Sequence, residues 1–194
     1  MKKHNLHYTI LLILFTAIFV NPLFSIKTLS YKTRYKKLYF SSNKKYAVGT
    51  FKSRTLHYIP SNGRRRSYHS FYLKNADEFI DVKISNNGRS VVCYFAKYPP
   101  EDEGGRSSVE NYTYYLARID TKTRKIITLD KTMRYPGKIA LSARGYYTAL
   151  GVNIYISGSY RIFVFNNRTG KKIASYGNHS IKGKVTKISF ITFK

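Results

Sequence analysis

The sequence predicts an all-β protein built from consecutive four-stranded antiparallel units. Three observations support this fold class. Aromatic residues are abundant, with 19 Tyr and 12 Phe among 194 residues, and such side chains suit the pleated, half-buried surface of a strand. Short apolar runs alternate with polar turns that contain glycine. This alternation of strands and turns also recurs along the chain with an irregular spacing.

The segment Gly137–Tyr176 shows the unit most clearly. It contains four runs typical of short strands, at Lys138–Leu141, Tyr146–Ile156, Tyr160–Phe165 and Lys171–Tyr176. Polar turns that contain glycine connect them, and glycine reaches the positive φ values of tight turns without steric cost. We therefore expect one antiparallel sheet whose strands follow each other in chain order.

Looser copies of this unit precede it, at Leu38–Thr50, Thr55–Tyr68, Asp81–Tyr94 and Tyr115–Leu129. Downstream, Lys184–Phe190 is a candidate for the first strand of a fourth unit. Irregular spacing around a constant pattern is what loop insertions produce in a repeat array.

These segments resemble the blades of WD-repeat and TolB-like β-propeller proteins. One shared motif is a strand followed by Ser-x-x-Gly, at Ile84–Arg89 and Leu141–Gly145. Another is an apolar strand followed by Asp or Asn, Thr and Lys, at Ile119–Lys125 and Phe165–Lys171. The chain contains no Trp, so the Trp-Asp signature is missing. The resemblance covers most of Leu38–Phe190 and implies propeller-like blades.

The number of units predicts an incomplete propeller. Three units and a fourth strand are fewer than the roughly four to eight blades of a closed ring. The expected fold is therefore a fragment of a longer propeller, an open stack of sheets or half of an assembly.

The N-terminal sequence predicts a targeting segment. Lys2 and Lys3 precede the uncharged apolar run Tyr8–Val20, and Asn21-Pro22 follows it. This order is typical of a secretory signal peptide, and an uncleaved membrane anchor is the alternative. We expect a signal or anchor at residues 1–25, a basic linker or edge strand at 26–37 and the repeat domain at 38–194. The predicted location is extracytoplasmic, either secreted or periplasmic, or anchored to the membrane.

Motifs for catalysis are missing. The sequence contains no metal-spaced His/Cys pair, no glycine-rich phosphate loop and no nucleophile elbow. We therefore expect no enzyme, no cofactor and no catalytic or metal site. An enzyme whose site is assembled from separated blade loops is the alternative. Cys93, within an apolar run, is expected to be a buried structural residue, and the acidic Pro99–Asn111 a solvated loop.

Basic residues are the most informative feature. Lys and Arg number 35 against 9 Asp and Glu, for a formal net charge of +26. The first and third turns of an antiparallel four-stranded sheet lie at the same end, and first turns here carry Lys44, Lys45, Arg89 and Arg144. Third turns carry the predicted polyanion-binding residues Arg64, Arg65, Arg66, Lys122, Arg124, Lys125, Arg168, Lys171 and Lys172.

This placement predicts a binding or scaffold protein without catalytic activity. Its expected partner is a protein or a polyanion, namely anionic lipid, glycan or nucleic acid, and the N-terminal apolar segment adds possible membrane association. The alternative is that Lys and Arg simply fill exposed turns in a lysine-rich chain.

Overall fold

The computed structural model describes residues 35–60, 69–100, 112–133, 137–154, 158–177 and 187–190. Within these ranges, twelve strands form three four-stranded sheets, each an antiparallel meander in chain order. Sheet 1 contains β1 (Lys37–Phe40), β2 (Ala47–Phe51), β3 (Thr55–Ile59) and β4 (His69–Tyr72). Sheet 2 contains β5 (Glu78–Ile84), β6 (Ser90–Lys97), β7 (Thr113–Asp120) and β8 (Ile126–Met133). Sheet 3 contains β9 (Gly137–Leu141), β10 (Tyr147–Ile154), β11 (Ser159–Asn166) and β12 (Lys172–Tyr176).

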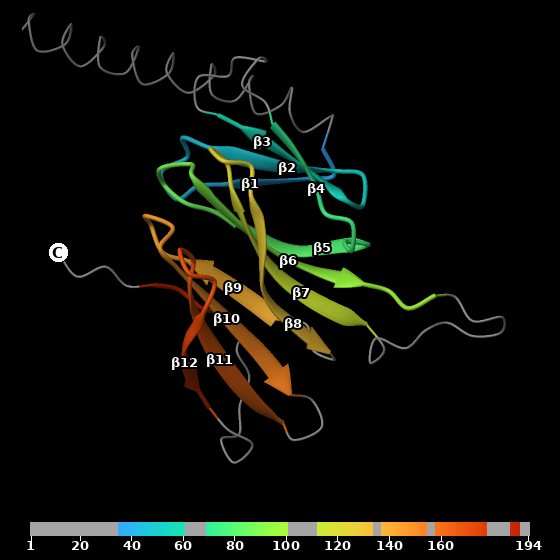
Figure 1. The fold of residues 1–194 in the computed structure, drawn as a ribbon, viewed down its shortest axis with the longest axis vertical. Coiled ribbons are helices and arrows are strands. Elements are labelled where there is room, and N and C mark those ends of the chain that lie inside the picture. Colours follow the sequence, from blue (N-terminus) through green and yellow to red (C-terminus); the bar gives the residue numbers. More distant parts are fainter. Residues whose placement is uncertain are drawn as a thin grey trace, which may run out of the picture.

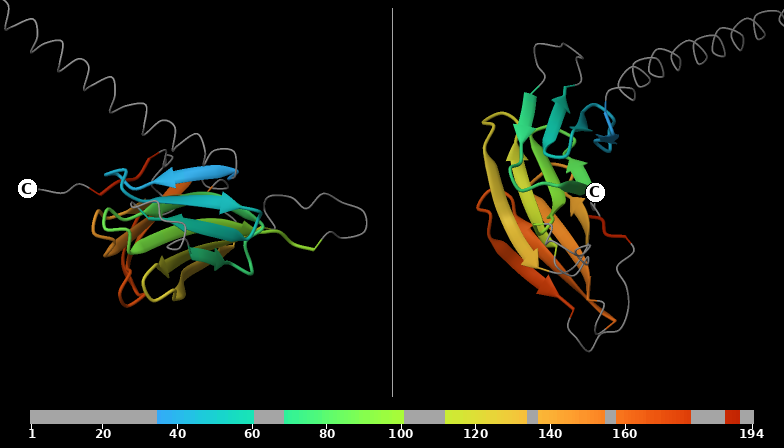
Figure 2. Two further views of the ribbon diagram at one scale, coloured as in Figure 1. Left: turned by 90° about the horizontal axis from the view of Figure 1, so that it is seen from above. Right: turned by 90° about the vertical axis from the view of Figure 1, so that its right-hand side faces the viewer.

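The sheets stack face to face in chain order, with sheet 2 between the other two (Figures 1 and 2). The first strands β1, β5 and β9 are neighbours, since β5 contacts both β1 and β9. The three described sheets do not close into a ring. The predicted all-β fold of consecutive four-stranded units is confirmed.

Strand β6 shows why sheet 2 is the centre of the stack. All but its last residue are buried, as expected for a strand covered on both faces. Val91, Cys93 and Phe95 belong to the core shared with sheet 1. The alternate residues Val92, Tyr94 and Ala96 belong to the core shared with sheet 3. The period of two thus divides one apolar run between two cores.

Cys93 is fully buried, as the sequence predicted. Its thiol donates a hydrogen bond to the carbonyl oxygen of Ala117, with the sulfur 3.6 Å from the oxygen. Burial raises the pKa of this thiol, so the thiolate is disfavoured at neutral pH. Cys93 is therefore a packing residue.

A serine builds the first turn of every sheet. In sheet 2, the N–H of Ser85 donates to the carbonyl of Ser90 at 2.9 Å, and the N–H of Ser90 donates back to the Ser85 hydroxyl at 3.0 Å. Ser41 and Ser142 make the same pair of bonds in sheets 1 and 3. The side chain thus satisfies a backbone donor that the turn would otherwise leave unpaired.

Glycine lets neighbouring first turns approach closely. Gly88 and Gly145 have φ values of 69° and 78°, which disfavour any side chain. A Cβ on Gly145 would lie 2.7 Å from the Cβ of Ser90, in the preceding sheet. The equivalent position of sheet 1, the first described sheet of the stack, is Lys44 with a φ of 56°. Glycine therefore occurs where this turn meets a preceding sheet.

Hydrogen bonds join the three first turns into a chain. The Nδ2 of Asn43 donates to the carbonyl of Asn86 at 2.8 Å. The N–H of Asn86 then donates to the carbonyl of Ala143 at 2.8 Å, and Nδ2 of Asn87 donates to the carbonyl of Arg144 at 3.2 Å. The sheets are thus fastened together at one end by turn-to-turn bonds.

Several sequence predictions concern the chain termini. Residues 1–25, the predicted signal or anchor, lie outside the described residues, as do residues 26–34. Lys37 opens β1, and the side chain of Tyr35 is buried against Ala47 and Ile59. The described part of the candidate fourth-unit strand, Lys187–Phe190, has no strand structure. Among the described residues, no helix is long and apolar enough to cross a membrane.

Replacing Gly145 by Ala tests the close approach of the first turns. The substitution forces a side chain into a positive φ and brings its Cβ within 3.0 Å or less of Ser85 and Ser90. We expect a loss of about 2–4 kcal/mol in the free energy of unfolding, measured by urea denaturation.

Gly158→Ala is the matched control. Gly158 also has a positive φ, of 59°, but no heavy atom lies within 4 Å of the position that a Cβ would take there. We expect only the backbone cost in this variant, about 1–2 kcal/mol. Equal losses in the two variants would contradict the interlocking of the first turns.

Candidate anion-binding surface

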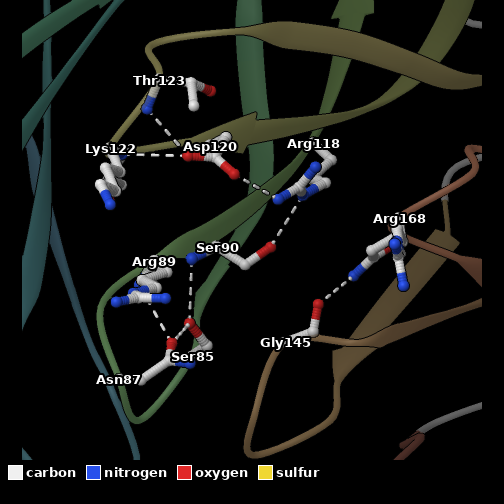
Figure 3. Close-up of polar contacts among 12 residues, drawn as sticks. Ser85, Asn87, Arg89, Ser90, Arg118, Asp120, Lys122, Thr123, Gly145 and Arg168 are labelled. Carbon is white, nitrogen blue, oxygen red and sulfur yellow. Dashed lines mark hydrogen bonds and ion pairs between the residues drawn. The ribbon is translucent and has the colours of Figure 1, made fainter.

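Two third turns have the same construction. Oδ1 of Asp120 accepts hydrogen bonds from the N–H groups of Lys122 and Thr123, at 3.1 and 3.0 Å (Figure 3). In sheet 3, Oδ1 of Asn166 accepts the equivalent bonds from Arg168 and Thr169, at 2.9 and 3.2 Å. The side chain at the strand end therefore holds the turn and fixes the backbone that carries the cations.

Residues inside the third turns attach them to the first turns. The N–H and hydroxyl of Thr121 donate to the carbonyls of Arg89 and Gly88, at 3.0 and 2.7 Å. In sheet 3, Nδ2 of Asn167 donates to the carbonyl of Gly145 at 2.9 Å. Both side chains are buried. First and third turns therefore lie together at one end of the stack, as the sequence predicted from strand order.

We call this end the basic end and define it by its described cations. They are all exposed, and they are Lys44, Lys45, Arg89, Lys122, Arg124, Lys125, Arg144, Arg168, Lys171 and Lys172. The structure thus brings the predicted residues of sheets 2 and 3 together. Arg64, Arg65 and Arg66 lie outside the described residues, so their placement stays a prediction.

Two of these cations already have partners. Nη2 of Arg124 lies 3.1 Å from Nδ1 of His69 on β4, so the guanidinium donates when His69 carries its proton on Nε2. The Nζ of Lys172 lies 5.1 Å from the centre of the Phe163 ring, a cation–π distance. The exposed Lys122, Lys125 and Arg168 are better placed to meet a ligand.

Asp120 is the one described acid among these turns, and another residue neutralises it. Its Oδ2 lies 2.7 Å from Nη2 of Arg118, and both side chains are less than a quarter exposed. Nε of Arg118 also donates to the Ser90 hydroxyl at 3.2 Å. Burial alone would raise the pKa of Asp120, but the Thr123 N–H and the Arg118 charge outweigh it and lower that pKa. A second carboxylate, Asp130 on β8, interacts with Lys172: burial raises the pKa of Asp130, and the Lys131 N–H and the Lys172 charge oppose this rise. The remaining turn cations form no ion pair within the described residues.

The opposite end of the stack also carries cations, as expected from strand order for residues between the units such as Lys131 and Lys138. These cations are Lys36, Lys37, Lys52, Arg54, Lys74, Lys97, Lys131 and Lys138. Asp77 and Glu78 lie among them, and Asp77 pairs with Arg54 at 2.9 Å. The two ends of the described stack thus differ in their acids rather than in their cations. The predicted acidic loop with Glu101, Asp102 and Glu103 lies outside the described residues.

No metal-binding arrangement is found in the described ranges, where no group of three His, Cys, Asp or Glu residues could hold an ion. Ion pairs within these ranges are Arg54–Asp77, Lys83–Asp81 and Arg118–Asp120. The chemistry that the basic end offers is thus electrostatic attraction by exposed cations.

Comparisons with known proteins concern the fold. No protein-family model and no curated protein matches the chain. Among solved structures, it is similar to AztD from Citrobacter koseri, at 12% identity and a TM-score of 0.50, over 72% of this chain and 34% of AztD. It is also similar to the acylaminoacyl peptidase of Pyrococcus horikoshii, at 10% identity and a TM-score of 0.51, over 75% and 25% of the two chains.

A third similar structure is the β-propeller domain of the Trilobed protease from Pyrococcus furiosus, at 9% identity and a TM-score of 0.46. It is matched over 69% of this chain and 38% of that chain. This chain therefore spans well under half of each of these proteins. The similar structures are mostly β-propeller proteins, and the three stacked meanders have the form of propeller blades. The chain has the fold of an incomplete β-propeller.

Replacing Asp120 by Asn tests the electrostatics of the basic end. Asn keeps the oxygen that accepts from Lys122 and Thr123 and removes the charge that faces Arg118. Because the pKa of Asp120 is lower in the folded state than its ordinary 3.8, its contribution is complete above that value and is lost as pH falls through the folded pKa. The free energy of unfolding of the variant should therefore fall less steeply below about pH 4.

Urea denaturation at neutral and at acidic pH measures this difference. Asp81→Asn is a suitable control, because Asp81 pairs with the more exposed Lys83 in the first strand of sheet 2. Identical acid sensitivity of wild type and Asp120→Asn would show that the Asp120–Arg118 pair does not stabilise the fold.

Proposed function

We propose that this protein is a non-catalytic binding or scaffold protein that holds a polyanionic partner against its basic end. The observation that carries the proposal is the set of exposed cations on adjacent first and third turns, where Arg118 already neutralises the turn residue Asp120. Anionic lipid, acidic glycan and nucleic acid all offer the repeated negative charge that such a surface attracts.

Rigidity of the turns supports the proposal. Thr121 and Asn167 tie the third turns to the first turns, and the first turns are tied to each other. The backbone positions of the cations are therefore fixed before a ligand arrives, which lowers the entropy that binding would cost. Ligand charges can reach them because the side chains are exposed.

A triple substitution tests the basic end. Lys122, Lys125 and Arg168 are exposed, and no ion pair within the described ranges involves them. Replacing all three by Ser should weaken binding to heparin-like glycan, DNA or anionic vesicles at least tenfold at low salt. The dependence of affinity on salt should also become less steep, because fewer counterions are released. The fold should survive, since exposed turn substitutions change stability by only about 0.5 kcal/mol each.

The matched control removes the same charge from the opposite end, by replacing Lys74, Lys97 and Lys138 with Ser. We expect a smaller loss of affinity in this variant. Equal losses in both triple variants would mean that net charge acts as a diffuse cloud. Undiminished binding by the Lys122, Lys125 and Arg168 variant would contradict the proposal.

The proposal includes a location outside the cytoplasm. Its support is the sequence of residues 1–25, in which two lysines precede an uncharged apolar run. N-terminal sequencing of the protein from its native host should give a chain that begins near Ile26 or, for an anchor, an intact N-terminus in the membrane fraction. A cytoplasmic product that keeps Met1 would contradict this location.

A further inference from the structure

A pocket lies between sheet 1 and sheet 2, at the end of the stack opposite the basic end. Its volume is about 290 Å³. Residues just before and within β1 form one side, and the turn after β2 forms another. The first residues of β5 and the Asp77 that precedes them complete the wall. The pocket is thus built from segments that only the stacking of the two sheets brings together.

Three lysines line this pocket, namely Lys36, Lys37 and Lys52. Antiparallel pairing of β1 with β2 brings them together, since Lys37 is the register partner of Thr50. The N–H of Lys36 also donates to the Thr50 carbonyl at 3.0 Å. All three lysines are exposed, and none belongs to an ion pair within the described ranges. The Nζ of Lys37 lies 5.1 Å from the centre of the Tyr39 ring, and the Nζ of Lys52 lies 5.8 Å from that of the Phe51 ring. These cation–π contacts hold the two ammonium groups against aromatic rings and leave their positive charges without a carboxylate partner among the described residues.

The two acids in the pocket wall are already engaged. Oδ1 of Asp77 pairs with Nη2 of Arg54 at 2.9 Å, and its Oδ2 accepts a hydrogen bond from the Tyr98 N–H at 2.9 Å. Oε2 of Glu78 accepts a short hydrogen bond of 2.6 Å from the Tyr98 hydroxyl. Arg54 therefore neutralises Asp77, whereas Glu78 keeps its negative charge. Three lysines outnumber this one uncompensated carboxylate in the lining, so the pocket still attracts an anion.

Aromatic side chains supply the apolar part of the pocket. Tyr39 and Phe79 both line it, and both pack against the core between the sheets. The hydroxyl of Tyr39 is buried and has no hydrogen-bond partner. Burial, and then the charge of Asp81, raise the pKa of Tyr39 to about 12, so this hydroxyl keeps its proton. Because this hydroxyl is closed to solvent, the ring of Tyr39 rather than its hydroxyl is the part that a ligand in the pocket would contact.

We infer that this pocket binds a small organic phosphate with an apolar or aromatic portion. Lysine ammonium groups bind phosphate as point charges, and a phosphate monoester carries nearly two negative charges at neutral pH. This half-open pocket of about 290 Å³ has room for a small molecule. The aromatic side chains in the wall favour a ligand that carries an apolar group as well as its phosphate. This site is separate from the basic end and does not depend on the polyanion proposal.

Titration of the full chain with phenyl phosphate by calorimetry tests the inference. We expect saturable binding with a stoichiometry of one, and at least tenfold weaker binding of inorganic phosphate and of benzyl alcohol. Replacing Lys37 and Lys52 by Ala should weaken phenyl phosphate binding at least tenfold. Lys52→Gly is a second variant that will fold, because Lys52 has a φ of 59° and glycine accepts this value more readily; it should weaken binding at least threefold.

The control replaces Lys74 and Lys97 by Ala, which removes the same charge from the same end but outside the pocket. It should keep the wild-type affinity within twofold. Equal weakening by both double variants, no binding by the wild type, or equal affinity for inorganic phosphate would overturn the inference.

The same titrations separate the two sites. The Lys122, Lys125 and Arg168 variant should bind phenyl phosphate normally, and the Lys37 and Lys52 variant should keep most of its polyanion binding. If the Lys122, Lys125 and Arg168 variant loses phenyl phosphate binding and the Lys37 and Lys52 variant keeps it, the phosphate binds at the basic end. That result would overturn the pocket site.

Discussion

The contact between neighbouring first turns is the constraint on which the rest of the structure depends. Gly88 and Gly145 combine a positive φ with a position where a side chain would meet the preceding sheet. The close approach that these glycines allow brings neighbouring turns within hydrogen-bond distance. Asn43 then bonds to Asn86, and Asn86 bonds to Ala143. The same short distance between neighbouring sheets buries sheet 2 on both faces. Alternate residues of β6 therefore pack into two different cores.

The arrangement of charge follows from this stacking. Strands that alternate in direction bring first and third turns to one end, and Thr121 and Asn167 fasten the two kinds of turn together. Among the residues of these turns, the acid Asp120 is neutralised by Arg118, so the exposed cations dominate this end. At the other end, Asp77 and Glu78 are engaged by Arg54 and Tyr98, and the nearby lysines border a pocket. One end of the stack therefore presents cations on exposed turns, and the other presents lysines around a pocket whose wall contains two carboxylates.

Local patterns in the sequence predicted much of this fold. The Ser-x-x-Gly motifs at Ser85 and Ser142 marked the first turns, because the serine hydroxyl and the glycine φ have local roles. Features that depend on contacts between sheets were not predictable. Thr121 resembles any polar turn residue in sequence, yet it is buried against Gly88. The pocket depends on β1–β2 register and on the Arg54–Asp77 pair, which join distant residues. Lys187–Phe190 has an alternating pattern without strand structure, because alternation does not specify a pairing partner.

Hydrogen exchange at the Asn86 amide tests the interlocking of the first turns most directly. Asn86 lies in a turn and is only partly buried, yet its N–H donates to the Ala143 carbonyl of the next sheet. If the stacked turns open only when the sheets separate, this amide should exchange as slowly as the amides in the centre of β6. Exchange as fast as that of an exposed turn amide such as Ser42 would contradict this interlocking.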